Sequence, residues 1–329
     1  MKKQSLISIL MPAKNAEIHI ESCIQSIINQ SYTHWELIIV NDHSTDDTLL
    51  KIKPFLKDGR ISLIDNKGEG IINALRTAFK QSEGEYISRM DADDLMPENK
   101  LLNLLTPLVS KGKGFISTGF VKYFSDEFEL KEGFINYEKW LNTLTKNILH
   151  WQQIYTECPI ASPAWLIHRE DLVNCGGFSS DIYPEDYDLI FRIRNSGIKV
   201  AAVNELIHLW RDHSNRTSRN DENYKNNLFA ELKVMHFLNQ DYNPKLCLYL
   251  WGAGRKGKEI AKQLINKHIN FIWISNNPKK IGHLIYNKKI AEIPDNFEKS
   301  KVIVVVSGLS EKLEIQKSFT PVNSLYFFC

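Results

Sequence analysis

The sequence predicts an α/β fold, in which a mostly parallel sheet flanked by helices is followed by a smaller α/β unit. Two observations lead to this expectation. Through the first third of the chain, short apolar runs alternate with amphipathic segments, and polar residues follow each run. A second alternation of the same kind begins near residue 246. Such alternation is typical of parallel strands that are joined by crossover helices.

The first third supplies seven expected elements. They are strand 6–11, helix 18–29, strand 35–40, helix 46–56, strand 61–64, helix 71–81 and strand 86–90. Apolar residues three and four apart mark the helices, and continuous apolar runs mark buried strands. Ser44 is expected to cap the second helix. Because open parallel sheets bind ligands at the carboxyl ends of their strands, the polar residues after each strand are candidate site residues.

The middle of the chain carries an aromatic and aliphatic stripe at helical spacing. We expect it to pack against the sheet, although it could instead line an acceptor groove or touch a membrane surface. The stripe consists of Tyr137, Trp140, Leu141, Leu144, Ile148, Trp151 and Tyr155.

Composition excludes several classes of protein. The 329 residues carry a formal net charge of +2, which argues against a nucleic-acid-binding protein. The five cysteines are widely spaced and form no CxxC pair, so neither a zinc site nor a disulfide framework is expected. A reducing, cytoplasmic setting fits this pattern. No apolar run approaches the ~18 residues of a membrane helix, so any membrane contact is expected from the surface.

The strongest chemical signal is the acidic run Asp91-Ala92-Asp93-Asp94, directly after the strand 86–90. Two carboxylates separated by one residue at a strand end can point the same way and form a hard oxygen site for Mg²⁺ or Mn²⁺. Such an ion could offset the charge that develops on a diphosphate leaving group. A polar loop with an aspartate that caps the next helix is the alternative interpretation.

Three segments together resemble family 2 glycosyltransferases, which have the GT-A fold. The first runs from Ile7 to Glu17, the second from Trp35 to Asp46 and the third from Gly84 to Asp94, in the order and spacing of that family. The resemblance covers about residues 5–220. It implies an inverting transfer of a sugar from a nucleotide-diphosphate donor, commonly a UDP-sugar, with Mn²⁺ or Mg²⁺.

The resemblance also implies roles for individual residues. Pro12, Asn15 and Glu17 would lie at the nucleotide pocket, and Asp42 would accept a hydrogen bond from the base. Taken without the family, Asp42 is equally well a turn or cap residue. The resemblance places Asp91 at the ribose or the metal.

The family resemblance implies two further roles on the donor side of the site. Asp93 would ligate the metal at the diphosphate. The family often has a basic residue near the donor at the position of Arg76, which could reach a phosphate or could be a solvated helix residue.

A sugar hydroxyl becomes a good nucleophile when a nearby carboxylate takes its proton. Pro184-Glu185-Asp186-Tyr187 resembles the Glu-Asp element of the family, in which the aspartate is the base. We therefore predict Asp186 as the catalytic base and Glu185 as a residue that orients it or contacts the acceptor. The alternative is an acidic pair at a helix start.

Two flanking segments complete the predicted site. Residues 162–169 resemble the acceptor-side segment of the family, so Trp165 is expected at the acceptor. Arg211 and His213 form an Arg-x-His element that would complete the phosphate and metal environment, although the histidine could equally be structural.

The last third contains Gly252-Ala253-Gly254-Arg255-Lys256-Gly257 after a predicted strand, in the GxGxxG spacing of a dinucleotide-binding turn. The acid expected at the end of the next strand to hold a ribose is absent, because that place reads Ser275-Asn276-Asn277. The turn could bind NAD(P) or another nucleotide, or it could serve folding alone. Further strands are expected at 270–274, 302–306 and 324–328.

We therefore expect a GT-A catalytic domain at residues 1–238, a linker at 239–245 and a Rossmann-like domain at 246–329. The expected partners are a nucleotide-sugar donor and a glycan or lipid-linked acceptor, with room for peripheral contact with the inner face of a membrane. Two alternatives come from other classes: an NAD(P)-dependent oxidoreductase acting through the tail, and a non-catalytic nucleotide-sugar-binding module. Intact Asp93 and Asp186 argue against the second.

Overall fold

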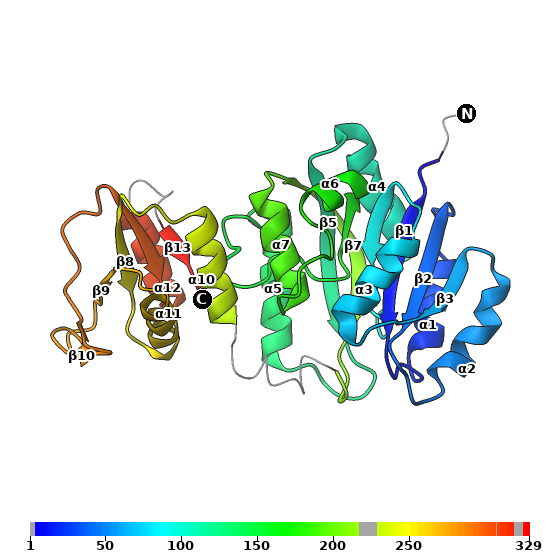
Figure 1. Cartoon of the computed structure of the whole chain (residues 1–329), viewed down its shortest axis with the longest axis horizontal. Helices are drawn as coiled ribbons and strands as arrows, with labels where there is room; N and C mark the ends of the chain where they lie inside the picture. Colours follow the sequence, from blue (N-terminus) through cyan, green and yellow to red (C-terminus); the bar gives the residue numbers. More distant parts are fainter. Residues whose placement is uncertain (1–3, 217–228, 307, 319–324) are drawn as a thin grey trace. The chain divides into compact units, whose positions relative to one another are not determined.

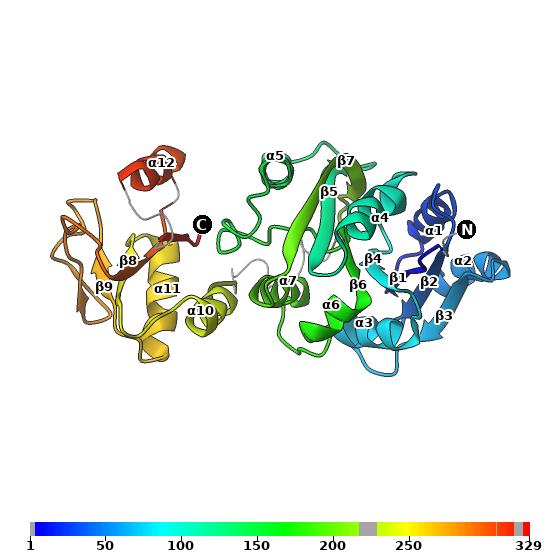
Figure 2. The same cartoon turned by 90° about the horizontal axis from the view of Figure 1, so that it is seen from above.

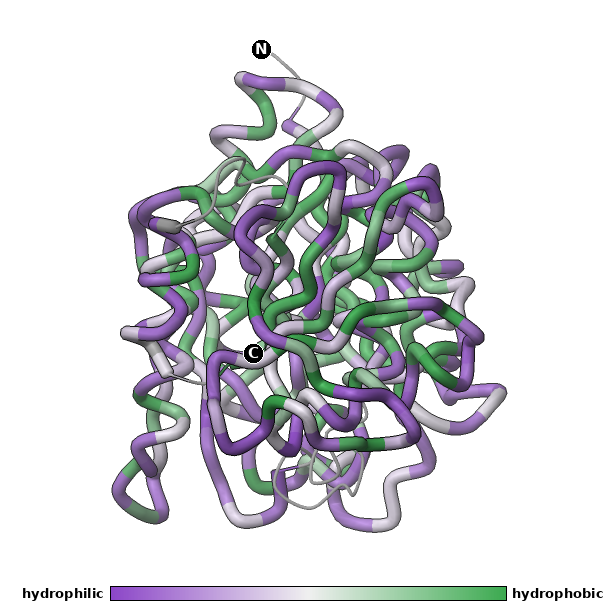
Figure 3. Tube along the Cα trace, turned by 90° about the vertical axis from the view of Figure 1, so that its left-hand side faces the viewer, coloured by the Kyte–Doolittle hydropathy of each residue, from purple (hydrophilic) through white to green (hydrophobic). Residues whose placement is uncertain are grey.

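The computed structural model describes residues 4–216, 229–306, 308–318 and 325–329. Internal contacts divide the chain into two compact units, Met1–Trp151 with Cys158–Thr217 and Gln152–Glu157 with Ser218–Cys329. Short hydrophobic and hydrophilic stretches alternate along the trace in Figure 3. No described helix is long and apolar enough to cross a membrane. All five cysteines lie among the described residues, and none of them forms a disulfide.

The first unit is built on a seven-stranded sheet in the order β3-β2-β1-β4-β6-β5-β7. Its strands are β1 (Ile7–Ala13), β2 (Trp35–Asn41), β3 (Ile61–Asp65), β4 (Tyr86–Arg89), β5 (Phe115–Phe124), β6 (Trp165–His168) and β7 (Lys199–Arg211). Neighbouring strands are parallel except that β6 runs antiparallel to β4 and to β5. The predicted mostly parallel α/β fold is confirmed.

Helices cover both faces of this sheet, as Figure 1 and the view from above in Figure 2 show. The helices are α1 (Ile20–Ile28), α2 (Thr48–Ile52), α3 (Gly70–Gln81), α4 (Lys100–Lys111), α5 (Glu132–Asn147), α6 (Arg169–Asn174) and α7 (Glu185–Asn195), with a 3₁₀ turn at Lys53–Lys57. In Figure 2, α1, α4 and α5 lie on one face and α3, α6 and α7 on the other. Burial on both faces explains why β1 and β2 read as continuous apolar runs.

Two local predictions were wrong. The stripe between Tyr137 and Tyr155 does not continue on one helical face, because α5 ends at Asn147 and Ile148 takes a left-handed conformation with a φ of 54°. Ser44 does not cap the second helix. Its hydroxyl accepts the Asn15 N–H instead, and the helix begins only at Thr48.

The second unit has a four-stranded parallel sheet in the order β13-β12-β8-β9. Its elements are α10 (Phe229–Gln240), β8 (Cys247–Trp251), α11 (Arg255–Asn266), β9 (Ile272–Ile274), β10 (Leu284–Ile285), β11 (Lys288–Lys289), β12 (Ser300–Val304), α12 (Leu309–Ser318) and β13 (Leu325–Phe327). Ser324, the first residue of the last predicted strand, lies outside the described residues.

The unit boundary differs from the predicted one at residue 238. Helix α10 and residues 152–157 belong to the second unit, in which the Phe237 ring contacts those of Tyr155 and Phe328. The sequence analysis had placed α10 in the first domain because this helix precedes the predicted linker at 239–245. The Rossmann-like character of this unit stays a prediction.

Candidate active site

The acidic run leaves the carboxyl end of β4, where its first two aspartates meet different partners. Asp91 Oδ1 accepts a hydrogen bond from Arg89 Nε at 3.0 Å. Asp93 Oδ2 lies 2.9 Å from Nε2 of His213, which follows β7. Burial alone would raise the pKa of Asp93, but the hydrogen bond from His213 and the charge of Arg216 lower the pKa below its ordinary value. Asp93 is therefore held as a carboxylate.

The surroundings of Asp93 include the other half of the predicted Arg-x-His element. Arg211 Nε donates to the main-chain oxygen of Asp93 at 2.8 Å, and its guanidinium also pairs with Asp126. The His19 ring, just before α1, lies 4.9 Å from the His213 ring, centroid to centroid. The structure thus brings together Asp93, Arg211 and His213 as expected, and it adds His19, which the sequence analysis did not single out.

The third aspartate of the run, Asp94, points into the protein. Its Oδ1 accepts the Arg211 N–H at 2.8 Å, and its Oδ2 lies 2.9 Å from His208 Nε2. The other ring nitrogen of His208 lies 3.3 Å from the ammonium of Lys100, which also donates to the Pro163 carbonyl at 2.7 Å. This buried network fixes the β4 turn to β7 and to the segment before β6.

Burial changes the protonation of that network. The desolvation of the Lys100 ammonium lowers its pKa to about 8, and desolvation lowers the pKa of His208 well below its usual range. The pKa of Asp94 is raised well above its ordinary value, chiefly by burial and then by the charges of Asp93 and Asp91. No sequence motif marks Lys100, because its partners lie far away along the chain.

Arg89 connects the acidic run to the predicted base. Its side chain is 6% exposed, and besides Asp91 it donates from Nη1 to Glu185 Oε1 at 2.9 Å. Glu185 and Asp186 begin α7, where the helix N-terminus favours negative charge. Burial would disfavour the Arg89 cation, but Asp91, Glu185 and Asp186 keep it charged by raising its pKa.

Asp186 follows Glu185 in α7, feels the charge of this arginine and accepts two hydrogen bonds from described residues. Its Oδ2 accepts the Ser162 hydroxyl at 3.3 Å, and its Oδ1 accepts the Tyr187 N–H at 2.7 Å. Burial raises the pKa of Asp186, partly offset by the positive charge of Arg89, and it raises the pKa of Glu185 in the same way. A raised carboxyl pKa makes a stronger base at neutral pH, which is the property that proton abstraction needs.

The predicted nucleotide residues lie at the carboxyl ends of β1 and β2. Asp42 is 4% exposed, and its Oδ1 accepts from Asn66 Nδ2 at 2.7 Å and from the Gly70 N–H at 3.0 Å. The ammonium of Lys14 lies 3.8 Å from its Oδ2. These contacts make Asp42 the link between β2 and the start of α3, which agrees with a turn residue. Its contact with a base stays a prediction.

The segment after β1 is joined to the segment after β2. Asn15 has a φ of 49°, and its side-chain oxygen accepts the Thr45 N–H at 2.8 Å. Glu17 Oε2 accepts the Asp47 N–H at 2.9 Å. Pro12 lies within β1 opposite Val40 of β2. The three residues predicted to line the nucleotide pocket beside Asp42 therefore come from one stretch of chain at the expected edge of the sheet.

Two predicted contacts are not supported by the geometry. Trp165 is 2% exposed within β6, so its side chain is covered by the protein and its contact with an acceptor stays a prediction. Arg76 donates to the carbonyls of Phe178, Ser179 and Ser180 and pairs with Asp181 at 2.7 Å. In the structure this arginine anchors the loop before α7, and its contact with a phosphate stays a prediction.

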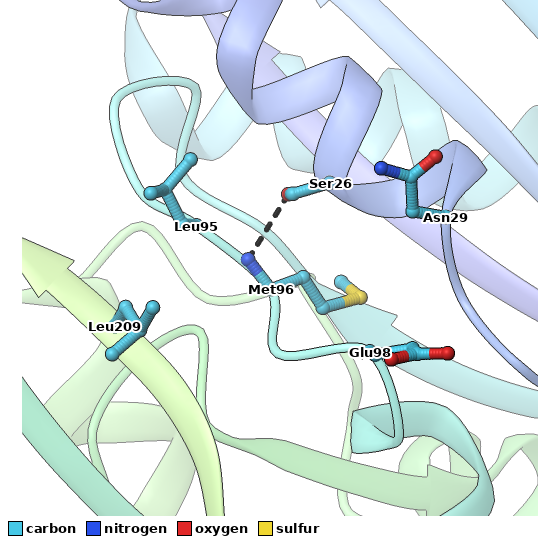
Figure 4. A pocket seen from close by; sticks show the side chains of 6 residues that line it. All are labelled: Ser26, Asn29, Leu95, Met96, Glu98 and Leu209. Atoms are coloured by element: carbon cyan, nitrogen blue, oxygen red, sulfur yellow. Dashed lines mark hydrogen bonds between the residues drawn. The ribbon is translucent and has the colours of Figure 1, made fainter.

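The first unit also has a hollow, which is lined in part by residues that follow the acidic run. Figure 4 shows Ser26 of α1 and Asn29 directly after this helix on one side of it, with Leu95, Met96 and Glu98 after the acidic run and Leu209 of β7 on the other. The Ser26 hydroxyl accepts the Met96 N–H at 3.0 Å. None of the predicted site residues lines this hollow.

The glycines of the tail have different roles. Gly252 has a φ of 119°, and a Cβ there would come within 2.5 Å of the Val305 carbonyl oxygen. A Cβ on Gly257 would lie 2.2 Å from the Gly252 oxygen. Space is open around Gly254, at the start of α11. Folding alone therefore requires two of the three glycines.

The family model of glycosyl transferase family 2 matches residues 8–176. An uncharacterised glycosyltransferase of Haemophilus influenzae is 30% identical over 254 residues, which cover 73% of this chain and 76% of that protein. The chain belongs to glycosyl transferase family 2. It is a glycosyltransferase, as the resemblance of its three segments predicted.

A second relative is similar over a shorter stretch. The Escherichia coli protein WfgD, a UDP-Glc:alpha-D-GlcNAc-diphosphoundecaprenol beta-1,3-glucosyltransferase, is 37% identical over 112 residues. That match covers 34% of this glycosyltransferase and 44% of WfgD.

Solved structures share the fold. TarS of S. aureus in complex with UDP-GlcNAc has a TM-score of 0.55 at 16% identity, over 79% of this chain and 72% of that one. The mannosyltransferase PcManGT of Pyrobaculum calidifontis, in complex with GDP-Man and Mn²⁺, has a TM-score of 0.54 at 18% identity, over 80% and 70%. At these identities the likeness establishes the GT-A fold. The relatives give no support to the predicted NAD(P) in the tail.

Proposed function

We propose that this glycosyltransferase moves a sugar from a nucleotide-diphosphate donor, a UDP-sugar, to an acceptor hydroxyl with inversion at the anomeric carbon. The observation that carries the proposal is the position of Arg89. This buried cation contacts Asp91 of the acidic run and Glu185 beside Asp186, so it joins the donor side to a carboxylate with a raised pKa.

In the proposed reaction, Asp186 takes the proton of the acceptor hydroxyl. The hydroxyl oxygen forms a bond to the anomeric carbon while the bond from that carbon to the diphosphate oxygen breaks. The electron pair of the broken bond leaves with the nucleoside diphosphate, and the proton stays on Asp186. Direct attack from the opposite side inverts the anomeric centre. Ser162, which donates to Asp186, keeps one carboxylate oxygen in place for the transfer.

The residues present fit a divalent cation. Asp93 is held as a carboxylate, and His213 Nε2 lies 2.9 Å from it, so an oxygen and a nitrogen donor adjoin. Among the described residues there is no group of three or more His, Cys, Asp or Glu that could hold a metal ion. A Mg²⁺ or Mn²⁺ site in nucleotide enzymes usually has one or two carboxylates, with phosphate oxygens and water as the other ligands. A bound cation would offset negative charge on the departing diphosphate.

The names of relatives guide the substrate proposal. WfgD is named for UDP-Glc and a diphosphoundecaprenol-linked acceptor, and a Bacillus subtilis relative, 34% identical over 119 residues, is named a putative teichuronic acid biosynthesis glycosyltransferase. We extend from these to a UDP-sugar donor and a glycan or lipid-linked acceptor in surface polysaccharide synthesis. The setting proposed for the reaction is the cytoplasmic face of a membrane.

Calorimetric binding of a panel of nucleotide-sugars, with and without Mn²⁺, tests the proposal. The wild type and Asp93→Ala are titrated in parallel, with Asp295→Ala in the second unit as a matched control for loss of an aspartate. We expect Mn²⁺-dependent binding of one UDP-sugar that Asp93→Ala weakens and Asp295→Ala does not. Binding of NAD or NADP without binding of any nucleotide-sugar would contradict the proposal and move the function to the tail.

A further inference from the structure

The charge of the second unit is unevenly placed. Residues 278–291, called here the basic hairpin, contain Lys279, Lys280, Lys288 and Lys289 and no aspartate or glutamate. The whole chain, by contrast, has nearly equal numbers of acidic and basic residues, 39 and 41. This local excess of positive charge lies outside the candidate active site.

The geometry of the basic hairpin is well defined. Strands β10 and β11 are antiparallel, with Leu284 opposite Lys289 and Ile285 opposite Lys288. The two residues between them, Tyr286 and Asn287, have φ values of 52° and 60°. Two consecutive left-handed residues are the mark of a type I′ turn, which matches the natural twist of a hairpin. The segment therefore holds its side chains in a defined arrangement.

One face of the basic hairpin rests on its own unit. Residues opposite each other in an antiparallel pair share a face, so Ile285 and Lys288 point the same way. Both are half-buried, and the Lys288 ammonium lies 4.7 Å from the centroid of the Phe271 ring. Next to them, the rings of Tyr286 and Trp273 are stacked, with their centroids 6.4 Å apart. These contacts fix which face is turned outward.

The opposite face carries an apolar residue beside a cation. Leu284 is 71% exposed, and Lys289 across from it is exposed as well. Tyr286 at the tip is 49% exposed, and Lys279 is exposed in the turn before β10. Figure 1 shows β10 at the edge of the second unit, beside β9.

We propose that the outward face of the basic hairpin binds the surface of a bilayer that contains anionic lipid. Lysines at such a surface are attracted by its negative potential, and each strengthens binding about fivefold. Tyrosine is enriched at the level of the lipid headgroups. An exposed leucine strengthens binding when it buries its apolar surface at the boundary between headgroups and acyl chains. The pairing of Leu284 with Lys289 matches that layered environment.

This chemistry favours a lipid surface over other anionic partners. A nucleic acid or an acidic protein would also attract the lysines. The charged surface of such a partner would offer Leu284 no apolar environment, so this leucine would stay in water. The binding is expected to be reversible, since few lysines and one leucine are involved, and salt should weaken it. The inference needs no step of the proposed sugar transfer, although both would bring the enzyme to a lipid-linked acceptor.

Cosedimentation of the full chain with vesicles tests the proposal. One set of vesicles is phosphatidylcholine alone and the other contains about one third phosphatidylglycerol. The test variant carries Lys279→Glu, Lys280→Glu and Lys289→Glu, while Lys288 is left because it packs on Phe271. The control carries the same charge change at Lys245, Lys262 and Lys267, which are exposed lysines of the same unit.

We expect binding to the anionic vesicles that falls in 0.5 M salt, on the order of 100-fold weaker in the hairpin variant and little weaker in the control. A separate Leu284→Ser variant should weaken binding several-fold. Equal binding by the two triple variants, or no preference for anionic vesicles, would overturn the proposal. So would an unchanged affinity of Leu284→Ser, which would indicate a general polyanion site and predict retention of RNA or acidic protein instead.

Melting temperatures and UDP-sugar calorimetry of all variants are measured in parallel. The variants should melt and bind donor like the wild type, since none of the changed residues lies in the candidate active site. Loss of vesicle binding with donor binding intact would support the hairpin alone. Vesicle binding without donor binding would support the hairpin while the proposed transfer fails.

Discussion

Replacing Arg89 with methionine should harm both stability and transfer, because this side chain satisfies two carboxylates at once. Methionine has a similar length and is tolerated in apolar surroundings, so the change removes chiefly the charge. Arg89 is 6% exposed, and its partners Asp91 and Glu185 are 25% and 11% exposed. Breaking a buried ion pair typically costs ~3–5 kcal/mol, mostly because the remaining charge stays buried without a partner.

The loss of stability in Arg89→Met should come unequally from its two partners, Asp91 and Glu185. Asp91 reaches some water, so most of the cost is expected from Glu185. Urea denaturation of Arg89→Met should then show a loss of about 3 kcal/mol, and adding Glu185→Gln should recover part of it by removing the unpaired charge. Arg89→Lys keeps the charge, but it cannot serve both carboxylates with a planar fork, so an intermediate loss is expected.

Transfer kinetics give the second readout. If Arg89 aligns Asp186 with the donor side, Arg89→Lys should lower kcat more than it raises the KM for the donor. Equal stability of Arg89→Met and the wild type, within ~0.5 kcal/mol, would refute the reasoning about the buried pair, given the usual cost of such a loss. An unchanged kcat in Arg89→Lys would refute the alignment role.

Three further predictions test other parts of the structure. The folded pKa of Lys100, about 8, is below its ordinary value of 10.5, so above pH 8 the unfolded chain binds more protons and stability should rise with pH. Lys100→Met should lack this gain, which is at most about 3 kcal/mol between pH 8 and 10.5 when urea midpoints are compared with the wild type. Gly257→Ala should destabilise the second unit in thermal melts because its Cβ would meet the Gly252 oxygen at 2.2 Å, whereas Gly254→Ala should melt like the wild type. Asp93→Asn should lose the Mn²⁺ dependence of UDP-sugar binding, and binding with wild-type metal dependence would count against Asp93 as a ligand.

The first half of the fold could be predicted from sequence because its signals are local. Strands β1 to β4 are short apolar runs, and the helices between them show apolar residues three and four apart. The acidic run and the Glu-Asp pair were found because each is a contiguous motif at a strand or helix end. The structure places both around Arg89, which stands two residues before Asp91 but 96 before Glu185.

The features that the sequence did not reveal depend on residues that lie far apart along the chain. Lys100 looks like an ordinary first residue of a helix, yet it is fully buried against His208 and Pro163. Trp165 stands in a segment that resembles an acceptor site, but the sheet order places it between β4 and β5, where it is covered. Helix α10 has apolar residues that suit either core, so only the three-dimensional contacts assign it to the second unit.

A transfer assay with Asp186→Asn beside the wild type tests the central claim most directly. The substrates are UDP-glucose and an α-GlcNAc-diphosphate lipid, or the donor that calorimetry selects, and the product is identified by NMR. We predict a β-linked product from the α-linked donor, a rate at least ~10²-fold lower in Asp186→Asn, and donor affinity that stays within about threefold. Transfer at the wild-type rate by Asp186→Asn, or a product that retains the α configuration, would contradict the account.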